Sequence, residues 1–563
     1  MRWTIKPKPD PSKVARLSKE LAVDSTTSFL LVQRGIETFE EAKNFFRPDL
    51  SDLHDPFLMK DMEKAVSRIE EAVENQENIL VYGDYDVDGT TSVALMSSYL
   101  LSFYPNVATY IPDRYEEGYG ISYKGIDFAE DNNFSLIIAL DCGIKAIDKV
   151  AYATKKGVDF IICDHHRPGA EIPKAKAVLD PKQEDCDYPF KELCGCGVGF
   201  KLIQALASKK GATIDDLVLY LDLVATAIGA DIVPIVGENR ILAYHGLKVI
   251  NENPRPGFEA ILKQVKKEKL TITDVVFIIA PRINAAGRMK HGNHAVTLLC
   301  ETDNNLAAEY AIDIDTYNTD RRDADKRITI EALAQIEENK EQDRLTSVVY
   351  DENWHKGVIG IVASRLIETY YRPTLVFTKS GEMLAASARS VKGFDVYNAL
   401  EKCSEYIEQF GGHKYAAGLT LKPENYKSFK AQFEKVVEET IDPKMLIPEI
   451  SIDSQINFSD ITPKFYRILS QFAPFGPGNM TPVFMSEDIQ DTGYGKQVGE
   501  DKTHLRFTAT QHGSGKIVGI GFGLGEHIEL IKNKKPFKAA YTIDENEWNG
   551  NVSLQLKLKD IKP

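Results

Sequence analysis

The sequence predicts an α/β protein with three folded parts. These are a doubly wound parallel-sheet domain, a smaller α/β domain joined to it by a long helix, and a C-terminal OB-type β-barrel. Three observations predict them: apolar strands alternate with helical stretches after residue 76, a shorter alternation follows over residues 345–445, and short strands and turns dominate from residue 446 onward. A chain of 563 residues is also too long for a single core.

Composition places the chain among soluble globular proteins, with 43% hydrophobic and 27% charged residues. No apolar run reaches the roughly 18 residues that cross a bilayer, and the N-terminus lacks the apolar stretch of a signal peptide. We therefore expect a cytoplasmic protein with no membrane partner. The net charge of −15 argues against a surface that binds nucleic acid everywhere, so such a substrate would need a local basic groove.

The seven cysteines stand at irregular spacings, which do not form a disulfide framework. Cys194-Gly195-Cys196 is too closely spaced for a zinc pair and has no second pair nearby. We interpret it as buried small residues in a Gly-rich turn.

Residues 1–75 are predicted to form a helical lead-in that packs on the first domain. Thr38 has the side chain of an N-cap for a helix that runs to Phe46, and residues 62–73 are amphipathic. No motif in this stretch carries chemistry.

The first domain, residues 76–290, opens with the stretch that organises the chain. The apolar run Asn78–Tyr82 predicts a buried strand, and Asp84, Asp86 and Asp88 follow at alternate positions before a helix expected from about Ser92. Ligands of open α/β sheets bind at this carboxyl edge of the strands.

Two alternatives remain for the triple-Asp motif. In a calcium-binding loop that starts at Asp84, Gly89 would hold the required sixth position, but the twelfth residue is Leu95 instead of a bidentate Glu. A solvated turn would leave three acids repelling one another. Both alternatives are weaker than a metal site.

Two later strands also end in polar side chains. Residues 135–140 lead into Asp141, and residues 160–163 lead into Asp164-His165-His166. A single Asp after a strand is usually a helix N-cap, and we interpret Asp180 in this way. Three such strand ends at one edge indicate a shared pocket.

The residue types indicate metal chemistry. Carboxylates with imidazole suit Mn²⁺ or Mg²⁺ better than zinc. Two such ions, about 3.5 to 4 Å apart, can activate water and stabilise charge during phosphodiester cleavage. Asp141, alone at the end of the middle strand, fits the carboxylate that contacts both ions.

The sequence Asp164-His165-His166, with the triple-Asp motif upstream, resembles the DHH phosphoesterase family. The resemblance implies a metal-binding DHH domain and catalytic roles for the matching residues, with a metal or phosphate contact for the last of them. These residues are Asp84, Asp86, Asp88, Asp141, His165 and His166. Tyr82 departs from the family pattern, because many relatives carry a His there.

A further acidic metal ligand is implied by the family's fourth motif, to which residues 221–234 are similar. Two acids lie in this stretch. We favour Asp231 over Asp222 as the ligand, and the choice between them stays open.

Three later motifs are similar to those of the bacterial single-strand-specific 5′-to-3′ DNA exonucleases within this family. They are Pro281–Met289, Trp354–Arg365 and Phe410–Gly418, and the whole resemblance runs from about residue 78 to 420. It implies metal-dependent hydrolysis of single-stranded DNA from its 5′ end to 5′-mononucleotides, in DNA repair and recombination. The implied partners are DNA, a RecQ-type helicase and a single-strand-binding protein, and the implied state is a monomer.

The same motifs imply a set of residues that hold the 5′ phosphate and the neighbouring backbone: Arg282, Asn284, Arg288, Ser387, Arg389, Gly411, Gly412 and His413. Gly411-Gly412 is predicted to form a turn whose amides make an anion-binding nest. Ser387 and Arg389 supply a hydroxyl and a guanidinium.

Residues 291–344 predict the connecting helix, whose charge run 320–327 we interpret as a solvated face rather than a DNA contact. Residues 345–445 resemble the family's DHH-associated domain. Residues 446–563 predict the OB-type barrel, with strands near 505–510, 516–520, 539–543 and 552–556, and such barrels bind single strands by stacking and a basic groove.

Two rival functions remain. Hydrolysis of short oligonucleotides or cyclic dinucleotides would use the same metals, but those relatives are typically shorter and the barrel favours a polymer. A non-catalytic DNA-binding scaffold would have lost the metal ligands, whereas this sequence retains the acids and both histidines.

Overall fold

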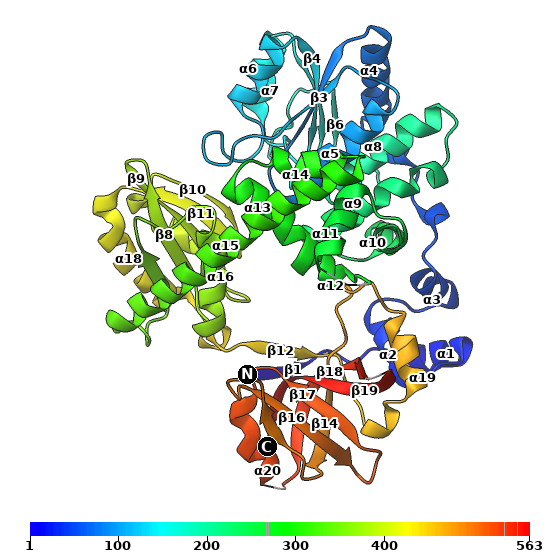
Figure 1. Ribbon diagram of the computed structural model, residues 1–563, viewed down its shortest axis with the longest axis vertical. Helices are drawn as coiled ribbons and strands as arrows, with labels where there is room; N and C mark the ends of the chain where they lie inside the picture. The colour runs from blue at the N-terminus through cyan, green and yellow to red at the C-terminus, as the bar shows by residue number, and fades with distance from the viewer. Residues whose placement is uncertain (266, 268, 534, 549) are drawn as a thin grey trace. The chain divides into compact units, whose positions relative to one another are not determined.

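The computed structural model describes residues 1–265, 267, 269–533, 535–548 and 550–563. The chain forms two compact units: Thr4–Ile314 with Ser451–Pro563, and Met1–Trp3 with Asp315–Ile450 (Figure 1). None of the described helices is long and apolar enough to cross a membrane.

A five-stranded parallel sheet forms the centre of the first unit. Its strand order is β3-β2-β4-β5-β6, with β2 (Asn78–Gly83), β3 (Val107–Tyr110), β4 (Phe134–Leu140), β5 (Asp159–Cys163) and β6 (Ala177–Leu179). Strands β2, β4 and β5 are apolar runs, as expected for strands covered on both faces.

Helices cover both faces of this sheet (Figure 1). One face carries α6 (Tyr123–Asp131) and α7 (Ile147–Lys155), and the other carries α4 (Met62–Glu74), α5 (Val87–Leu101) and α8 (Gly195–Lys209). The predicted doubly wound sheet is therefore confirmed.

Helix α5 begins at Val87, five residues before the expected start near Ser92. The side chain of Asp86 accepts a hydrogen bond from the Gly89 N–H at 3.0 Å and caps the helix. Asp88 lies in the first turn, where a negative charge interacts favourably with the helix dipole. The triple-Asp motif is thus partly helical.

A helical layer follows the sheet in the first unit and packs on α5 and α8 through α9. Its helices are α9 (Leu221–Ala230), α10 (Gly237–Glu252), α11 (Pro256–Val265), α12 (Ile272–Asp274), α13 (Ala280–Met289) and α14 (Asn293–Cys300). A π-helical turn, Val275–Ile279, directly precedes α13. Pro281 follows this turn within a continuous helical stretch, and because its nitrogen carries no N–H it donates no hydrogen bond to the preceding turn.

The first 46 residues do not pack as the sequence suggested. Helices α1 (Pro11–Leu21), α2 (Ser25–Gln33) and α3 (Phe39–Phe46) share a hydrophobic core with the C-terminal barrel, for example Leu30 and Leu31 with Phe472 and Phe484. Helix α4 packs on β6 of the first domain's sheet, and Phe45 of α3 contacts Arg240 of α10. Residues 2–5 also form a strand, β1 (Arg2–Ile5), which pairs with β12 (Glu449–Ile452).

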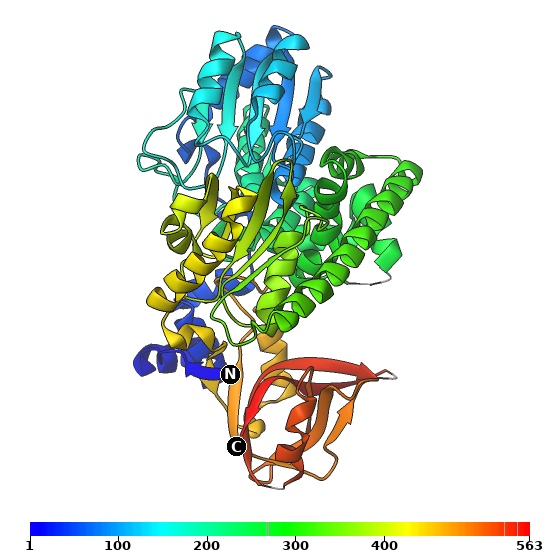
Figure 2. The same ribbon diagram turned by 90° about the vertical axis from the view of Figure 1, so that its left-hand side faces the viewer.

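The C-terminal part of the first unit is a closed OB-type barrel, as predicted (Figure 2). The sheet runs β14-β18-β19-β17-β16, and β16 pairs back onto β14 and closes it. The strands are β13 (Ser454–Gln455), β14 (Phe484–Asp491), β15 (Lys496–Val498), β16 (His504–Gln511), β17 (Ile517–Gly521), β18 (Phe537–Trp548) and β19 (Asn551–Lys562). Helices α19 (Pro463–Ser470) and α20 (Ile528–Lys532) accompany them.

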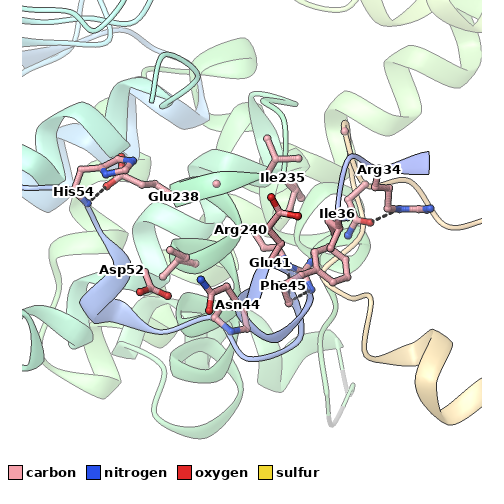
Figure 3. A pocket seen from close by; sticks show the side chains of 16 residues that line it. Arg34, Ile36, Glu41, Asn44, Phe45, Asp52, His54, Ile235, Glu238 and Arg240 are labelled. Atoms are coloured by element: carbon pink, nitrogen blue, oxygen red, sulfur yellow. Dashed lines mark hydrogen bonds between the residues drawn. The ribbon is translucent and has the colours of Figure 1, made fainter. Parts of the chain in front are cut away.

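Arg240 joins the N-terminal helices, α10 and the segment before the barrel (Figure 3). It is 4% exposed, and its guanidinium donates to the carbonyl oxygens of Phe45, Phe472 and Ala473 at 2.9 to 3.0 Å. It also lies 3.8 Å from the centre of the Phe45 ring. Beside it is a cavity of about 350 Å³, lined by residues that include Arg34, and none of the candidate metal ligands lines it.

Arg240→Met is expected to destabilise this junction by about 3 kcal/mol, because several buried carbonyl oxygens lose their donor at once. Urea unfolding monitored by circular dichroism would measure the change. Arg16→Met, at an exposed position of α1, is the matched control and should leave the midpoint unchanged. Equal midpoints for the two variants would contradict the role of Arg240.

The second unit is built on a mixed five-stranded sheet of order β10-β11-β9-β8-β7. Its strands are β7 (Ser347–Tyr350), β8 (Thr374–Ser380), β9 (Met383–Arg389), β10 (Gln409–His413) and β11 (Ala416–Leu421). Its helices are α16 (Ile359–Thr369), α17 (Val396–Glu401) and α18 (Tyr426–Thr440).

The connecting helix is α15 (Asn304–Glu338), a single helix of 35 residues. The interpretation of its charge run as a solvated face is wrong for Asp325, which is 2% exposed and binds Arg365 of α16 at 2.8 Å. Further along the same helix, Glu331 accepts a hydrogen bond from the Trp354 indole N–H at 2.7 Å. These charges therefore attach α15 to the second unit.

Candidate metal centre

The register of the parallel sheet aligns four aspartates at its carboxyl edge. Gly83 pairs with Leu140, Leu140 with Cys163, and Cys163 with Leu179. The next residue of each strand is an aspartate: Asp84, Asp141, Asp164 and Asp180. Acids that are up to 96 positions apart in the chain therefore lie side by side across β2, β4, β5 and β6, and the expected shared edge is present.

Asp84 and Asp86 connect this row to the start of α5. Asp84 is fully buried, its Oδ1 accepts from the Gly120 N–H at 3.4 Å, and its Oδ2 has no hydrogen-bond partner among the described residues. Gly89 packs directly on this backbone, since a Cβ there would lie 2.3 Å from the Asp84 carbonyl oxygen. The turn that carries the acids is thus tightly packed.

His165 stands among three carboxylates. Its Nε2 lies 3.2 Å from Asp141 Oδ1, 3.6 Å from Asp231 Oδ2 and 3.8 Å from Asp88 Oδ2. The residue is 6% exposed, so these groups meet in a site largely shielded from water. The site brings together the ends of β4, β5 and α9 with the first turn of α5.

The N-terminus of α8 holds two of these acids in place. The N–H groups of Gly195 and Cys196 donate to the two carboxylate oxygens of Asp88, each at 2.7 Å. A Cβ on Gly195 would lie only 2.6 Å from Asp141 Cβ and 2.8 Å from its Cα. The Cys-Gly-Cys stretch is therefore a helix start that positions acids, and not the predicted Gly-rich turn.

Asp231 and Asp222 have different environments. Asp231 caps the C-terminal end of α9 and faces His165. Asp222 is fully buried in the first turn of the same helix, and both of its oxygens accept from Arg255, at 2.7 and 2.8 Å. The structure thus places Asp231 in the cluster and commits Asp222 to an ion pair.

Burial and mutual repulsion disfavour ionisation of the acids at this edge. Burial and neighbouring carboxylates raise the pKa of Asp88 to about 7 and that of Asp231 to about 8. For the same reasons the pKa values of Asp84 and Asp141 lie well above the usual range. Burial lowers the pKa of His165 to about 3, so its ring is neutral and able to bind a metal at pH 7.

The residues present fit divalent cations. Asp84 Oδ2, Asp141 Oδ1 and His165 Nε2 are buried atoms without a hydrogen-bond partner among the described residues. Ligand atoms from two sets lie within 4.8 Å of one another: Asp141 with His165 and His166, and Asp88 with His165 and Asp231. Carboxylate oxygens with imidazole suit Mn²⁺ and Mg²⁺, and bound cations would offset the buried negative charge.

Asp164 positions the two histidines. Its Oδ1 accepts from the backbone N–H groups of His165 and His166 at 2.7 and 3.1 Å, and its Oδ2 accepts from the Ile144 N–H at 2.9 Å. The same Oδ1 lies 2.8 Å from His166 Nδ1. Although burial favours the neutral ring, this contact raises the pKa of His166 to about 9. A protonated His166 is suited to contact a phosphate oxygen.

Tyr119 contacts the other side of the His166 ring. Its hydroxyl lies 3.2 Å from His166 Nε2, and its ring packs edge-on against Tyr85. Tyr82, by contrast, is fully buried, and its hydroxyl donates to the Gly120 carbonyl at 2.9 Å and accepts from the Ser122 N–H. Tyr82 therefore supports the adjacent loop, while Tyr119 extends the site beyond the residues found by sequence.

Tyr119→Phe is expected to lower kcat by about fivefold, because one hydrogen bond that orients the His166 ring is lost. Unfolding should be unaffected, since Tyr119 is 55% exposed. Steady-state kinetics of phosphodiester cleavage, with thermal unfolding of the same sample, would measure both. A variant with an unchanged kcat would exclude an orienting role.

Helix α13 carries Arg282, Asn284 and Arg288 and packs on the loop after β2. A Cβ on Gly287 would lie 2.7 Å from the Tyr85 carbonyl oxygen, so the two backbones are in close contact. Arg114 reinforces this contact, because it donates to the Gly287 carbonyl at 3.1 Å and stacks on the Tyr85 ring. These three candidate residues therefore lie on a helix attached to the aspartate loop.

The other candidate substrate-binding residues lie together in the second unit. The strand register places Arg389, Ala416 and His413 in one row across β9, β11 and β10, and Ser387, Gly418 and Gly411 in another row two residues away. They gather at one end of this sheet.

The predicted Gly411-Gly412 turn is wrong, because both glycines lie in the edge strand β10, and the hairpin turn comes after His413. Gly412 is needed there because a Cβ would lie 2.4 Å from the Ala416 carbonyl oxygen. Arg389 Nη1 donates to Ser387 Oγ at 3.0 Å, and no described carboxylate pairs with this guanidinium. Its charge therefore remains available for an anion.

Family models match three stretches of the chain. The DHH family N-terminal domain matches residues 78–228, the DHHA1 domain matches residues 342–439, and the RecJ OB domain matches residues 452–560.

Curated proteins of similar sequence carry one description. The single-stranded-DNA-specific exonuclease RecJ of Bacillus subtilis (strain 168) is 37% identical, with 100% of this chain and 70% of that protein covered. The protein of the same description from Escherichia coli (strain K12) is 34% identical, with 89% and 90% covered.

Solved structures show a similar fold. The crystal structure of RecJ in complex with Mn²⁺ from Thermus thermophilus matches with a TM-score of 0.86 and 26% identity, over 100% of this chain and 79% of that one. A second crystal structure, of exonuclease RecJ bound to manganese, matches with a TM-score of 0.62 and 30% identity, over 71% and 99%.

Proposed function

Because the chain belongs to the RecJ family of single-stranded-DNA-specific exonucleases, we propose that it hydrolyses single-stranded DNA from the 5′ end and releases 5′-mononucleotides, with Mn²⁺ or Mg²⁺ as cofactor. The observation that carries the proposal is the convergence of Asp88, Asp141, His165 and Asp231 on one buried site with unpartnered ligand atoms among the described residues. Such a site needs cations to offset its charge, and phosphodiester cleavage needs the same cations.

We assign the metal-binding role to the six residues of this edge: Asp84, Asp86, Asp88, Asp141, His165 and Asp231. Bound divalent cations supply an activated water and stabilise charge on the cleaved phosphate. Asp141 would be the ligand that serves both ions, since its Oδ1 is buried without a hydrogen-bond partner among the described residues and lies 3.2 Å from His165 Nε2. Asp88 is oriented by the two α8 amides.

We assign phosphate contacts to His166 and to the candidate substrate-binding residues. His166, held by Asp164, would donate to an oxygen of the cleaved phosphate. Capture of the 5′ phosphate and adjacent backbone is assigned to the remaining candidates: Arg282, Asn284, Arg288, Ser387, Arg389, Gly411, Gly412 and His413. Uniform backbone contacts of this kind make activity independent of sequence and sensitive to salt.

The test of this function is the release of nucleotides from a 5′-labelled, 5′-phosphorylated single strand in the presence of Mn²⁺. The expected result is a labelled mononucleotide as the first product, with a blunt duplex resistant and chelation of the metal abolishing release. Binding without release would support the rival non-catalytic scaffold. Cleavage of dinucleotides alone would support the rival oligonucleotide phosphodiesterase, which the barrel at residues 452–560 disfavours.

Arg389→Ala is expected to reduce the preference for 5′-phosphorylated over 5′-hydroxyl ends by about tenfold to hundredfold, because a charge-assisted hydrogen bond to the phosphate is lost. Competition between the two ends in one reaction measures this preference. Lys379→Ala, at an exposed position of β8, is the control and should keep it. An unchanged preference in the Arg389 variant would remove this residue from 5′-end capture.

The wider context is part of the same proposal. We propose roles in DNA repair and recombination, in the cytoplasm, with a RecQ-type helicase that exposes single strands and a single-strand-binding protein as partners. We propose that the protein acts as a monomer.

A further inference from the structure

A basic depression of about 540 Å³ lies at the carboxyl end of β6. Three cations line it, Arg167, Lys182 and Lys191, together with the acids Glu184 and Glu192. We call it the β6 pocket. No residue proposed above as a metal ligand or phosphate contact lines it.

Topology places the β6 pocket beside the metal centre. Arg167 directly follows His166 at the end of β5, and Lys182 comes two residues after Asp180, the last acid of the aspartate row. The Lys182 N–H donates to Asp180 Oδ1 at 2.7 Å, which fixes the start of this loop. The cations thus occupy the strand end next to the one that carries the histidines.

The cations of the β6 pocket are only weakly neutralised by the protein. Lys182 Nζ lies 3.8 Å from Glu192 Oε2, a partly exposed pair of little strength. No described residue forms a salt bridge with Arg167, which is exposed. Lys191 Nζ donates to the Cys186 carbonyl oxygen at 2.5 Å. Cations outnumber acids by one in the lining of the β6 pocket, whereas the whole chain carries a net charge of −15.

We propose that the β6 pocket binds a backbone phosphate of the DNA strand adjacent to the phosphate being cleaved. This inference rests on the proposed function. Neighbouring strands of a sheet lie about 4.8 Å apart, so a DNA strand that runs along the carboxyl edge from β5 toward β6 passes the β6 pocket close to the cleaved phosphate. Arg167 and Lys182 then contact the phosphate whatever the DNA sequence. The β6 pocket supplies the local basic groove that an acidic protein needs to bind DNA.

The test compares Lys182→Ala with Lys174→Ala, an exposed lysine of the β5–β6 connection that does not line the β6 pocket. Lys182→Ala is expected to raise KM for single-stranded DNA by about tenfold with kcat nearly unchanged. The slope of log(kcat/KM) against log salt should become shallower by about 0.7, the contribution of one phosphate contact on a single strand. Lys182→Arg should restore both values, and Lys174→Ala should change neither.

Methylphosphonate linkages, which are neutral, identify the contacted phosphate. With the wild type, a single such linkage at the contacted position should raise KM as much as Lys182→Ala does. With the Lys182→Ala variant, the same linkage should raise KM no further. The proposal would be overturned if the Lys174 and Lys182 variants had the same KM. It would also be overturned if the effects of Lys182→Ala and of a methylphosphonate on KM were additive at every linkage. A Lys182→Ala variant that has a normal KM but is no longer inhibited by 5′-mononucleotide would also overturn it, because the β6 pocket would then bind the product. A wild type that releases no nucleotide would instead refute the proposed function itself.

Discussion

Asp141→Asn is expected to lower kcat on single-stranded DNA by about 10³-fold or more, because a metal ligand is worth several kcal/mol of charge stabilisation in the transition state. Asn has nearly the same shape as Asp, so the contact with Gly195 is retained. Without metal, the variant should be more stable than the wild type by about 1 kcal/mol, since a buried carboxylate that faces other carboxylates is removed. Urea unfolding measures this gain.

Metal-linked stability gives a readout that does not depend on catalysis. At Mn²⁺ concentrations near one hundred times Kd, the wild type should gain about 2.7 kcal/mol of unfolding free energy, and the variant much less. Asp222→Asn is the contrasting control: it breaks a buried pair with Arg255, so the fold should lose about 3 kcal/mol while the Mn²⁺-dependent gain remains. An active Asp141→Asn enzyme, or one stabilised by Mn²⁺ as much as the wild type, would contradict the assignment.

Gly195→Ala is expected to lower activity by about 100-fold, because a displacement of reacting groups by about 1 Å has an effect of that size. The added Cβ would lie 2.6 Å from Asp141 Cβ, so the strand end or the start of α8 must move. The same shift disturbs the 2.7 Å hydrogen bond from the Gly195 N–H to Asp88. Apparent Mn²⁺ affinity, measured by thermal stabilisation, should therefore fall together with kcat.

Gly197→Ala separates this effect from a general effect on the helix. Gly197 lies in the same turn of α8, but the atoms nearest to its added Cβ would be those of the Leu193 side chain and Cys194 Sγ, at 3.3 to 3.6 Å. Ala favours a helix by about 1 kcal/mol over Gly, so this variant should keep its activity. If both variants lose activity equally, the contact between Gly195 and Asp141 is not the cause.

The aspartate edge could be predicted because strand ends are visible in a sequence. Apolar runs that stop at Asp84, Asp141 and Asp164 need only the rule that parallel strands align their carboxyl ends. The resemblance to the DHH family then supplied roles for residues in later motifs. The OB-type barrel was also predictable, although β14 was missed because its polar outward face weakens the apolar alternation.

What sequence could not give depends on contacts between distant segments. The Asp88 carboxylate is held by backbone amides 107 and 108 positions later in the chain. Such donors cannot be recognised in a sequence, because almost every residue type has a backbone N–H. Asp222 and Asp231 look alike in one motif, and only the approach of Arg255 distinguishes them. A turn and the edge strand β10 cannot be told apart at Gly412, because its positive φ and its close contact with the Ala416 carbonyl would require glycine in either setting.

The shared core of the first 46 residues and the barrel affects how the chain folds during synthesis. Arg34 binds Asn479, 445 positions later, so the ribosome needs roughly 20 to 90 seconds between them at about 5 to 20 residues per second. Throughout this interval the apolar face around Leu30 and Leu31 lacks its final cover. Newly made α1–α3 therefore depend on segments that are synthesised late. Nascent chains released before Phe484 would expose an apolar surface that favours aggregation or chaperone binding.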